Sequence, residues 1–253
     1  MKLLLDAGNT RLKAALGAPG GGLTMLGETG HREPGLPAAL ELVLSGADLG
    51  GVGTALCANV AGERAGEALA AALRERGIAV EFLRASREAC GVRCAYAEPA
   101  RLGADRWAGL LGARALADGS CLVVDAGSAL TIDAMAAGGQ HLGGWILPGL
   151  ALMVASLEAR TGDLGARRRA SAASAPADFP ADTAPAMDGG ALLAACGAVR
   201  MAQARLESRC REPARLLLAG GDAGRLAPEL DGAELVPDLV LRGLARAASA
   251  TVS

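Results

Sequence analysis

The sequence predicts an α/β fold made of two related halves. Strand-like apolar segments alternate with segments of helical spacing along most of the 253 residues. An apolar strand followed by Asp-Ala-Gly and a small polar residue occurs twice, at Leu3 to Thr10 and at Leu122 to Ala129, nearly half a chain apart. Similarity on that scale favours two similar units, expected over 1–118 and 119–253, rather than a solenoid.

The composition limits the core and the partners. Hydrophobic residues make up 51% of the chain and aromatic residues only 2%, so the core is expected to consist of Ala, Leu and Val, and disorder of the whole chain is excluded. Lys and Arg number 25 against 27 Asp and Glu, a formal net charge of −2. This balance offers no positive field for nucleic acid or an anionic membrane surface, and neither partner is expected.

The N-terminus and the remaining apolar stretches predict a soluble, cytoplasmic chain. Asp6 follows only three leucines, too early for the apolar region of a signal peptide. Glycine and proline over 138–149 interrupt the longest uncharged stretch, which excludes a membrane helix. The six cysteines are scattered without a zinc pattern. Of the two histidines, His31 lies in a Gly- and Pro-rich segment that we expect to be exposed, so histidine-centred catalysis is not expected.

In the first half, continuous or alternating apolar runs predict strands, and i, i+3, i+4 spacing predicts helices. The strands are expected over 2–6, 11–16, 52–60 and 79–83, and the helices over 38–44, 63–76 and 105–116. The segment 7–10 supplies a tight turn, so the first two strands form a hairpin. A further turn is expected at 20–22, where three glycines are adjacent.

The second half opens with a second hairpin over 121–134. A connector rich in Ala, Ser, Pro and Arg follows over 165–185, and its three consecutive arginines are expected to be solvated. Helical spacing then predicts a long helix over 191–211, an apolar run predicts a strand over 215–218, and a closing helix is expected over 239–248.

A strand that ends in Asp and turns through Gly suits a phosphate group and its metal, because the carboxylate lies beside exposed backbone N–H groups. We expect Asp6 on the metal side, residues 8–10 around phosphate oxygens, and Lys13 as a point charge. The alternative is a plain hairpin with an exposed lysine. The sequence has no P-loop, no dinucleotide-binding fingerprint and no nucleophile elbow.

An ordered set of motifs across nearly the whole chain resembles the type III pantothenate kinase family, a branch of the acetate and sugar kinase, heat-shock ATPase and actin superfamily. The motifs are Asp6-Ala7-Gly8-Asn9-Thr10 with Lys13, Tyr96 with Leu102-Gly103-Ala104-Asp105-Arg106, Val124 to Asp133, Gly143 to Gly149, Asp182-Thr183, and Gly220-Gly221-Asp222-Ala223.

The resemblance implies two actin-like (ribonuclease H-like) lobes with a nucleotide and substrate cleft between them. It also implies transfer of the ATP γ-phosphate to pantothenate, the first step of coenzyme A synthesis. The expected cofactors are Mg²⁺ with ATP and either K⁺ or ammonium, and the expected assembly is a homodimer.

Residue roles follow from the same resemblance. Asp105 takes the position of the general base, and Asp125 that of a monovalent-cation ligand. Asp6 is the candidate Mg²⁺ ligand. The ATP contacts are Asp6, Ala7, Gly8, Asn9, Thr10, Arg11, Leu12, Lys13 and Ser128. The pantothenate contacts are Tyr96, Gly103, Ala104, Asp105, Arg106 and Thr183, with Thr183 supplied by the partner subunit.

Each of these side chains also has a simpler explanation. Asp105 could be the N-cap of its helix, Arg106 an ordinary solvated helix residue, and Tyr96 a partly buried ring. Ser128 stands where the family usually has threonine. Two other functions remain open: a kinase for another small hydroxyl substrate, and a regulatory or accessory binding protein of the same family.

Overall fold

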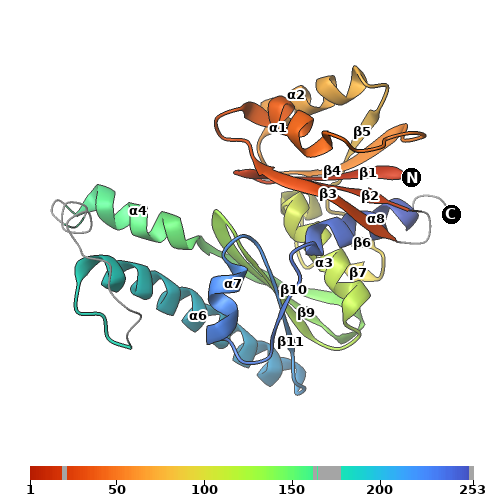
Figure 1. Ribbon diagram of the computed structural model, residues 1–253. Helices are drawn as coiled ribbons and strands as arrows, with labels where there is room; N and C mark the ends of the chain where they lie inside the picture. Colours follow the sequence, from red (N-terminus) through yellow and green to blue (C-terminus); the bar gives the residue numbers. More distant parts are fainter. Residues whose placement is uncertain (19–21, 162–163, 165–177, 251–253) are drawn as a thin grey trace. The chain divides into compact units, whose positions relative to one another are not determined.

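The computed structural model describes residues 1–18, 22–161, 164 and 178–250 (Figure 1). The chain forms two compact units. The first contains Met1–Gly119, Met135–Gly143 and Asp238–Ser253, and the second contains Ser120–Ala134 and Gly144–Pro237. The expected lobe limits of 1–118 and 119–253 remain a prediction. Residues 20–21 of the expected glycine turn and 165–177 of the expected connector lie outside the described residues.

The sheet of the first unit has five strands among the described residues, in the order β3-β2-β1-β4-β5. Their bounds are β1 (Lys2–Ala7), β2 (Arg11–Gly17), β3 (Leu23–Gly30), β4 (Thr54–Asn59) and β5 (Ala79–Phe82). β1, β2 and β3 are antiparallel, whereas β1, β4 and β5 are parallel. The carboxyl ends of β1, β4 and β5 therefore meet at one edge of this sheet.

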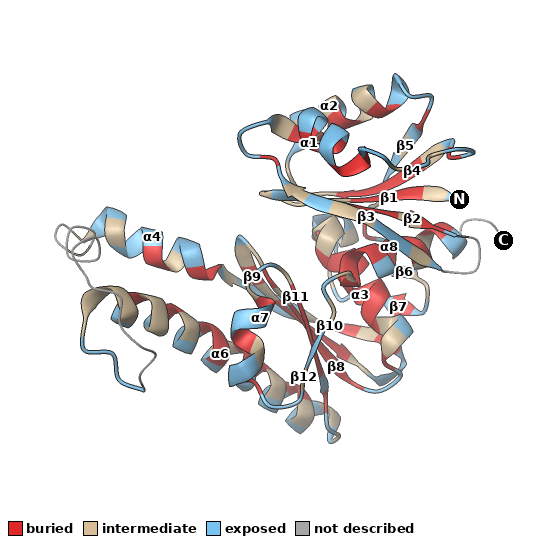
Figure 2. Ribbon diagram, in the orientation of Figure 1, coloured by how far each residue is buried: buried red, intermediate tan, exposed pale blue. Residues whose placement is uncertain are grey.

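Helices cover both faces of this sheet, with α1 (Gly35–Leu44) and α2 (Glu63–Arg74) on one face and α3 (Ala104–Leu116) and α8 (Leu239–Ala250) on the other (Figure 1). Leu3 and Leu5 of β1 belong to the core cluster on the α1 and α2 side. Leu4 belongs to the cluster on the α3 and α8 side. Both faces are buried (Figure 2), which explains why three consecutive leucines open the chain.

Two glycines allow α3 and α8 to cross closely. A Cβ placed on Gly112 would lie 2.3 Å from the carbonyl oxygen of Leu239, and one placed on Gly243 would lie 1.8 Å from that of Ala108. These contacts fix the position of α3, whose N-terminus carries Asp105. The short elements of this unit are β6 (Glu88–Ala89), β7 (Val92–Arg93), η1 (Pro99–Arg101) and η2 (Ala137–Gly139).

The sheet of the second unit has the strand order β12-β11-β8-β9-β10. Its strands are β8 (Cys121–Ala126), β9 (Ala129–Ala136), β10 (Gln140–Pro148), β11 (Arg215–Ala219) and β12 (Ala233–Leu235). The first residues of β10 belong to the first unit, where Gln140 pairs with Arg93 of β7, and β7 pairs with β6. The helices of the second unit are α4 (Leu150–Arg160), α6 (Thr183–Cys210), α7 (Ala223–Leu226) and η3 (Ala227–Glu229).

Most predicted elements are present within a few residues of their expected bounds. The start of the long helix is an exception, because α6 begins at Thr183 rather than at 191. The carboxylate of Asp182 accepts a hydrogen bond from the Thr183 N–H at 2.7 Å and so caps the helix. Strands β3, β10 and β12 were not predicted. None of the described helices is long and apolar enough to cross a membrane.

Candidate functional site

The first Asp-Ala-Gly segment is a hairpin turn between β1 and β2, as predicted. The Gly8 N–H donates to the carbonyl oxygen of Arg11 at 3.0 Å and closes the turn. Asp6 on β1 lies opposite Lys13 on β2. Side chains alternate between the faces of a strand, so Asp6 points to the same face as Leu4, the face covered by α3 and α8.

The N-terminus of α3 lies at the same face of the same sheet. Ala104 packs against the cluster that contains Leu4 and Ala58. A Cβ placed on Gly103 would lie 3.9 Å from Cγ1 of Val60, the residue that follows β4. The structure therefore brings the start of α3, with Asp105, to the face and edge of the sheet where Asp6 lies.

Asp105 lies in the first turn of α3, after the N-cap residue Gly103. The alternative that Asp105 itself is the N-cap is therefore wrong. Its Oδ1 accepts a hydrogen bond from the backbone N–H of Arg106 at 2.7 Å. A Cβ on Gly103 would lie 2.7 Å from this oxygen, so glycine leaves room for the carboxylate to fold back. A carboxylate at this end of a helix is also favoured by the helix dipole.

Arg106, Tyr96 and His141 form a polar cluster in the first unit. Nη1 of Arg106 donates to the Tyr96 hydroxyl at 3.1 Å, and its Cζ lies 5.9 Å from the centre of the tyrosine ring. The tyrosine ring stacks on His141 with 6.1 Å between centroids. Arg106 is only 8% exposed and His141 is fully buried, so the alternative explanation of Arg106 as an ordinary solvated helix residue is wrong.

The chain around Tyr96 is also held in place. The two guanidinium nitrogens of Arg87 donate to the carbonyl oxygens of Tyr96 and Ala97 at 3.2 and 3.0 Å. Sequence reasoning missed His141, because its burial depends on contacts with residues more than forty positions earlier in the chain, such as its hydrogen bond with the Ala95 N–H.

His31 is buried, contrary to the expectation of an exposed residue. It is 9% exposed, and its Nε2 lies 2.7 Å from the carbonyl oxygen of Gly8. Its backbone N–H donates to the carbonyl oxygen of Thr10 at 3.0 Å. Residue 31 follows β3, which pairs with β2, and this pairing brings the histidine beside the hairpin turn.

The second Asp-Ala-Gly segment is the turn between β8 and β9 in the second unit. Three backbone bonds surround it: Gly127 N–H to Ala129 O, Gly149 N–H to Ser128 O, and Asp222 N–H to Ala126 O, at 3.0, 3.2 and 2.9 Å. Asp125 is the penultimate residue of β8, and Ser128 is exposed in the turn.

Two glycines are required by close approach to this turn. A Cβ on Gly149 would lie 2.2 Å from the carbonyl oxygen of Gly127. One on Gly220 would lie 2.4 Å from both the carbonyl oxygen of Ala126 and Oδ1 of Asp125. Both glycines lie within motifs that carry the family resemblance, over 143–149 and 220–223.

The predicted site residues are divided between the units. Asp6 to Lys13, Tyr96 and 103–106 belong to the first unit, whereas Asp125, Ser128 and Thr183 belong to the second. Thr183 is the first residue of α6. The expected cleft between two lobes remains a prediction.

A cavity of about 820 Å³ adjoins the N-terminus of α3 within the first unit. Gly103 and Ala104 line it, together with Asn59 and Val60 at the end of β4. Both ends of the Asn59 amide are engaged, with Oδ1 accepting from Ala61 N–H and Nδ2 donating to Gly62 O, each at 3.0 Å. This cavity is the part of the first unit where a ligand could contact the Gly103-Ala104 segment.

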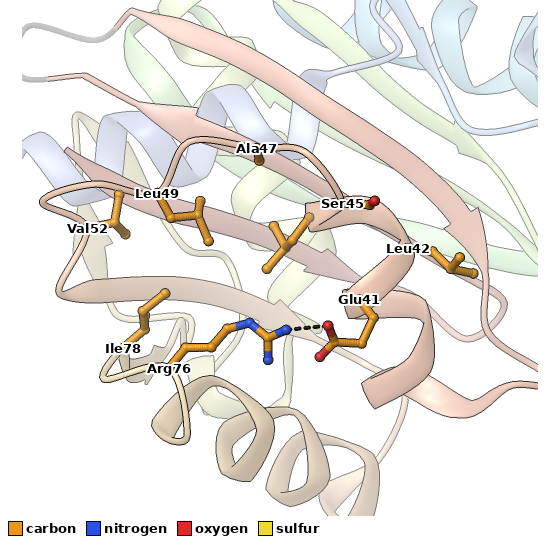
Figure 3. A pocket seen from close by; sticks show the side chains of 9 residues that line it. Glu41, Leu42, Ser45, Ala47, Leu49, Val52, Arg76 and Ile78 are labelled. Carbon is orange, nitrogen blue, oxygen red and sulfur yellow. Dashed lines mark hydrogen bonds and ion pairs between the residues drawn. The ribbon is translucent and has the colours of Figure 1, made fainter.

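A second cavity, of about 670 Å³, has a different lining (Figure 3). It is lined mainly by apolar side chains after α1 and α2, and an ion pair joins Arg76 to Glu41. It contains none of the predicted site residues, so we do not assign it to the site.

The acidic groups suit a metal that is shared with a ligand. Among the residues that the structure describes, no group of three or more His, Cys, Asp or Glu could hold a metal ion. Mg²⁺ often binds through one or two carboxylates plus substrate phosphates, and Asp6 fits that arrangement.

Burial, with a further contribution from the negative charge of Asp6, raises the pKa of Cys57 to about 12. This thiol therefore stays protonated and is not a nucleophile.

Comparison with known proteins identifies the family. A sequence model of type III pantothenate kinases matches residues 2–205, a range that contains every predicted site residue. The chain belongs to the type III pantothenate kinase family. A type III pantothenate kinase of Azoarcus sp. (strain BH72) is 42% identical over 260 residues, which cover 99% of this chain and 91% of that protein. One of Chromobacterium violaceum is 40% identical, covering 98% of this chain and all of that protein.

Solved structures show the same fold. A conserved protein from Campylobacter jejuni, named for a Baf family of transcriptional activators, is 25% identical with a TM-score of 0.54, over 96% of this chain and 94% of that one. A protein from Sinorhizobium meliloti with the name of a 2-dehydro-3-deoxygalactonokinase is 17% identical with a TM-score of 0.55, over 99% of both chains. The predicted α/β, actin-like fold class is confirmed.

Proposed function

We propose that this chain transfers the γ-phosphate of ATP to the primary hydroxyl of pantothenate, the first step of coenzyme A synthesis. Membership of the family supports the reaction. The observation that carries the site is that the Asp6 hairpin and the N-terminus of α3 lie on one face of one sheet. The hairpin could therefore hold the phosphates of ATP while Asp105 contacts the pantothenate hydroxyl.

Asp105 is the general base in this proposal. The pantothenate hydroxyl oxygen attacks the γ-phosphorus, its proton passes to the Asp105 carboxylate, and the bond to the β-phosphate oxygen breaks to release ADP. Such transfers depend mainly on positioning and charge neutralisation, so a carboxylate suffices as base. The Arg106 N–H that bonds Oδ1 restrains the orientation of the carboxylate.

ATP phosphates bind at the first hairpin. The Gly8 N–H already donates to the carbonyl oxygen of Arg11, so the backbone N–H groups of Asn9 and Thr10 and the Lys13 ammonium supply the positive partners. Ser128 adds a contact from the second turn. Asp6 would hold Mg²⁺ together with the phosphates, and the bound ion would supply positive charge near the transferred group. Asp125 would hold K⁺ or ammonium at the end of β8, in the turn that Gly149 and Gly220 approach closely.

Pantothenate binds to Tyr96, 103–106 and Thr183. Arg106 binds the carboxylate of pantothenate, because a guanidinium can donate two parallel hydrogen bonds to a carboxylate. The Tyr96 hydroxyl already fixes one of its nitrogens before the substrate arrives. An arginine oriented in advance loses less side-chain entropy on binding.

The enzyme is a cytoplasmic homodimer in this proposal, with neither nucleic acid nor membrane as partner. Large apolar side chains exposed on the second unit support the dimer: Trp145, Ile146, Leu152, Leu157, Leu193 and Met201. Met201→Glu should shift the molar mass measured by light scattering from dimer to monomer. Met25→Glu, an exposed methionine of the first unit, is the control, and a dimer that survives Met201→Glu contradicts this interface.

Release of ADP with Mg-ATP and pantothenate tests the reaction, measured with and without K⁺ or ammonium. Asp105→Asn should lower kcat by at least about a hundredfold, the contribution typical of a general base. The exposed Asp118→Asn is the matched control. Turnover that is unchanged in Asp105→Asn contradicts the base. ATP binding without turnover of pantothenate under any cation contradicts the substrate, and other small hydroxyl compounds would then be screened.

A regulatory role is the second candidate, because the Campylobacter relative carries the name of a transcriptional activator. Asp105→Asn separates the two functions. A purely regulatory protein should keep its effect on transcription after this substitution, whereas an effect that depends on phosphorylation should be lost with the turnover.

A further inference from the structure

His31 and the first hairpin turn are joined by two hydrogen bonds. Its ring Nε2 lies 2.7 Å from the carbonyl oxygen of Gly8, and its backbone N–H donates to the carbonyl oxygen of Thr10 at 3.0 Å. A carbonyl oxygen can only accept, so Nε2 carries the hydrogen and donates it. The histidine therefore holds the turn at its first and last residues.

His31 is itself held firmly. It is 9% exposed, and its carbonyl oxygen accepts the N–H of Gly35, the first residue of α1, at 3.0 Å. Gly35 has a φ of +78°, a left-handed conformation that glycine adopts without strain. The ring donor is thus anchored to a helix that packs on the core, and not to a free loop.

The orientation of one peptide group follows from this contact. No cis peptide occurs among the described residues, so the peptide between Gly8 and Asn9 is trans. In a trans peptide the C=O and the N–H of the next residue point in opposite directions. Because the Gly8 carbonyl points to His31, the Asn9 N–H points away from it. Asn9 is exposed, which leaves this N–H on the open side of the turn.

We propose that His31 is a positioning residue for ATP: it fixes the Gly8–Asn9 peptide so that the Asn9 N–H is presented to a phosphate oxygen. This inference rests on the proposed role of the hairpin as an ATP-phosphate loop. Without the ring donor, the Gly8 carbonyl and the Asn9 N–H can rotate together. The affinity for ATP then falls, while the pantothenate contacts on Tyr96 and Arg106 are untouched.

Two substitutions test the role of the donor. His31→Phe keeps the ring volume and removes the N–H, whereas His31→Gln places an amide N–H near the position of Nε2. Calorimetric titration with Mg-ATP, without any acceptor, should show Kd about tenfold higher for His31→Phe, the change expected for one lost hydrogen bond. His31→Gln should stay within about threefold of the native Kd. Pantothenate affinity should be unchanged in both variants.

The outcomes separate positioning from simple stabilisation. Thermal unfolding of each variant identifies a misfolded sample, and rescue of the ATP affinity by His31→Gln supports the proposal. Native Mg-ATP affinity in His31→Phe overturns it, as does an equal loss of ATP and pantothenate affinity in both variants. Failure of the native chain to bind Mg-ATP overturns the proposed function itself. This outcome is seen in the native sample, whereas failure of the His31 proposal is seen in the variants.

Discussion

Arg106 donates a hydrogen bond to the hydroxyl of Tyr96 at 3.1 Å, and the tyrosine ring in turn stacks on the buried His141. The chain orients its proposed carboxylate-binding guanidinium through these contacts before any substrate is present. A buried arginine needs such partners, because desolvation of an unpaired charge is costly. In the proposed site, Tyr96 would accordingly act on pantothenate through Arg106 as well as through its own contact.

Tyr96→Phe keeps the ring and removes the acceptor of the Arg106 bond. We expect the KM for pantothenate to rise about fivefold to tenfold, because the loss of one hydrogen bond costs on the order of 1 kcal/mol. The KM for ATP should change by less than about twofold. Steady-state kinetics with each substrate varied in turn measure both values. A larger effect on ATP than on pantothenate would contradict this role.

Gly220→Ala should damage the second turn. The new Cβ would lie 2.4 Å from the carbonyl oxygen of Ala126 and from Oδ1 of Asp125, and Gly220 has a φ of +93°. We expect a loss of roughly 1 to 3 kcal/mol in the free energy of unfolding, together with weaker activation by K⁺. Gly221→Ala is the matched control, because a Cβ there has no neighbour within 4 Å. Urea unfolding and K⁺ titration of the activity compare the two, and equal behaviour would argue against a crowded turn.

The two hairpins could be predicted because they depend on local pattern: apolar alternation sets each strand, and Asp-Ala-Gly sets each turn. The start of α6 was missed because Thr183, Ala184 and Pro185 continue the composition of the connector, whereas the cap on Asp182 is a matter of side-chain geometry. His31 and His141 were missed for a different reason. Their burial and partners depend on strand pairing and on distant segments, which a single sequence does not show.

Glu28 forms ion pairs with two positively charged side chains of the proposed ATP-phosphate hairpin. Its two carboxylate oxygens lie 2.6 Å from Nη1 of Arg11 and 3.8 Å from Nζ of Lys13. Asp6, Lys13 and Glu28 are also directly opposite one another on β1, β2 and β3. In the proposed site, an ATP phosphate would therefore compete with Glu28 for Lys13.

Glu28→Gln removes that competing charge. We expect the Kd for Mg-ATP to fall about twofold to fivefold at low ionic strength, since partly exposed ion pairs contribute little. The difference should shrink as salt is added, because salt screens charges at the surface. Glu33→Gln, an exposed acid beyond β3, is the control. Weaker ATP binding in Glu28→Gln would mean that the carboxylate positions Lys13 instead of competing for it.

Glu212 gives the second unit a pH-dependent contribution to stability. Its Oε1 accepts from the hydroxyl and the backbone N–H of the buried Ser120, at 2.5 and 3.0 Å. These two bonds lower the pKa of the Glu212 carboxyl, with the hydroxyl bond the larger cause. The Ser120 carbonyl also accepts from Arg215 N–H, so the contact fixes the start of the parallel pair β8 and β11.

The direction of the pH effect follows from the lowered pKa. A carboxyl with a lower pKa in the folded chain contributes stability that is fully present above the unfolded pKa and is lost as pH falls through the folded pKa. The Glu212→Gln variant has no carboxylate and so lacks this pH-dependent contribution to stability. The native chain should therefore exceed the variant in its urea midpoint at pH 7, and the gap should narrow between about pH 5 and pH 3. Glu229→Gln, an exposed glutamate of the same unit, should show no comparable gap. A gap that is constant with pH, or that widens on acidification, would show that the Ser120 contact does not favour the ionised carboxylate.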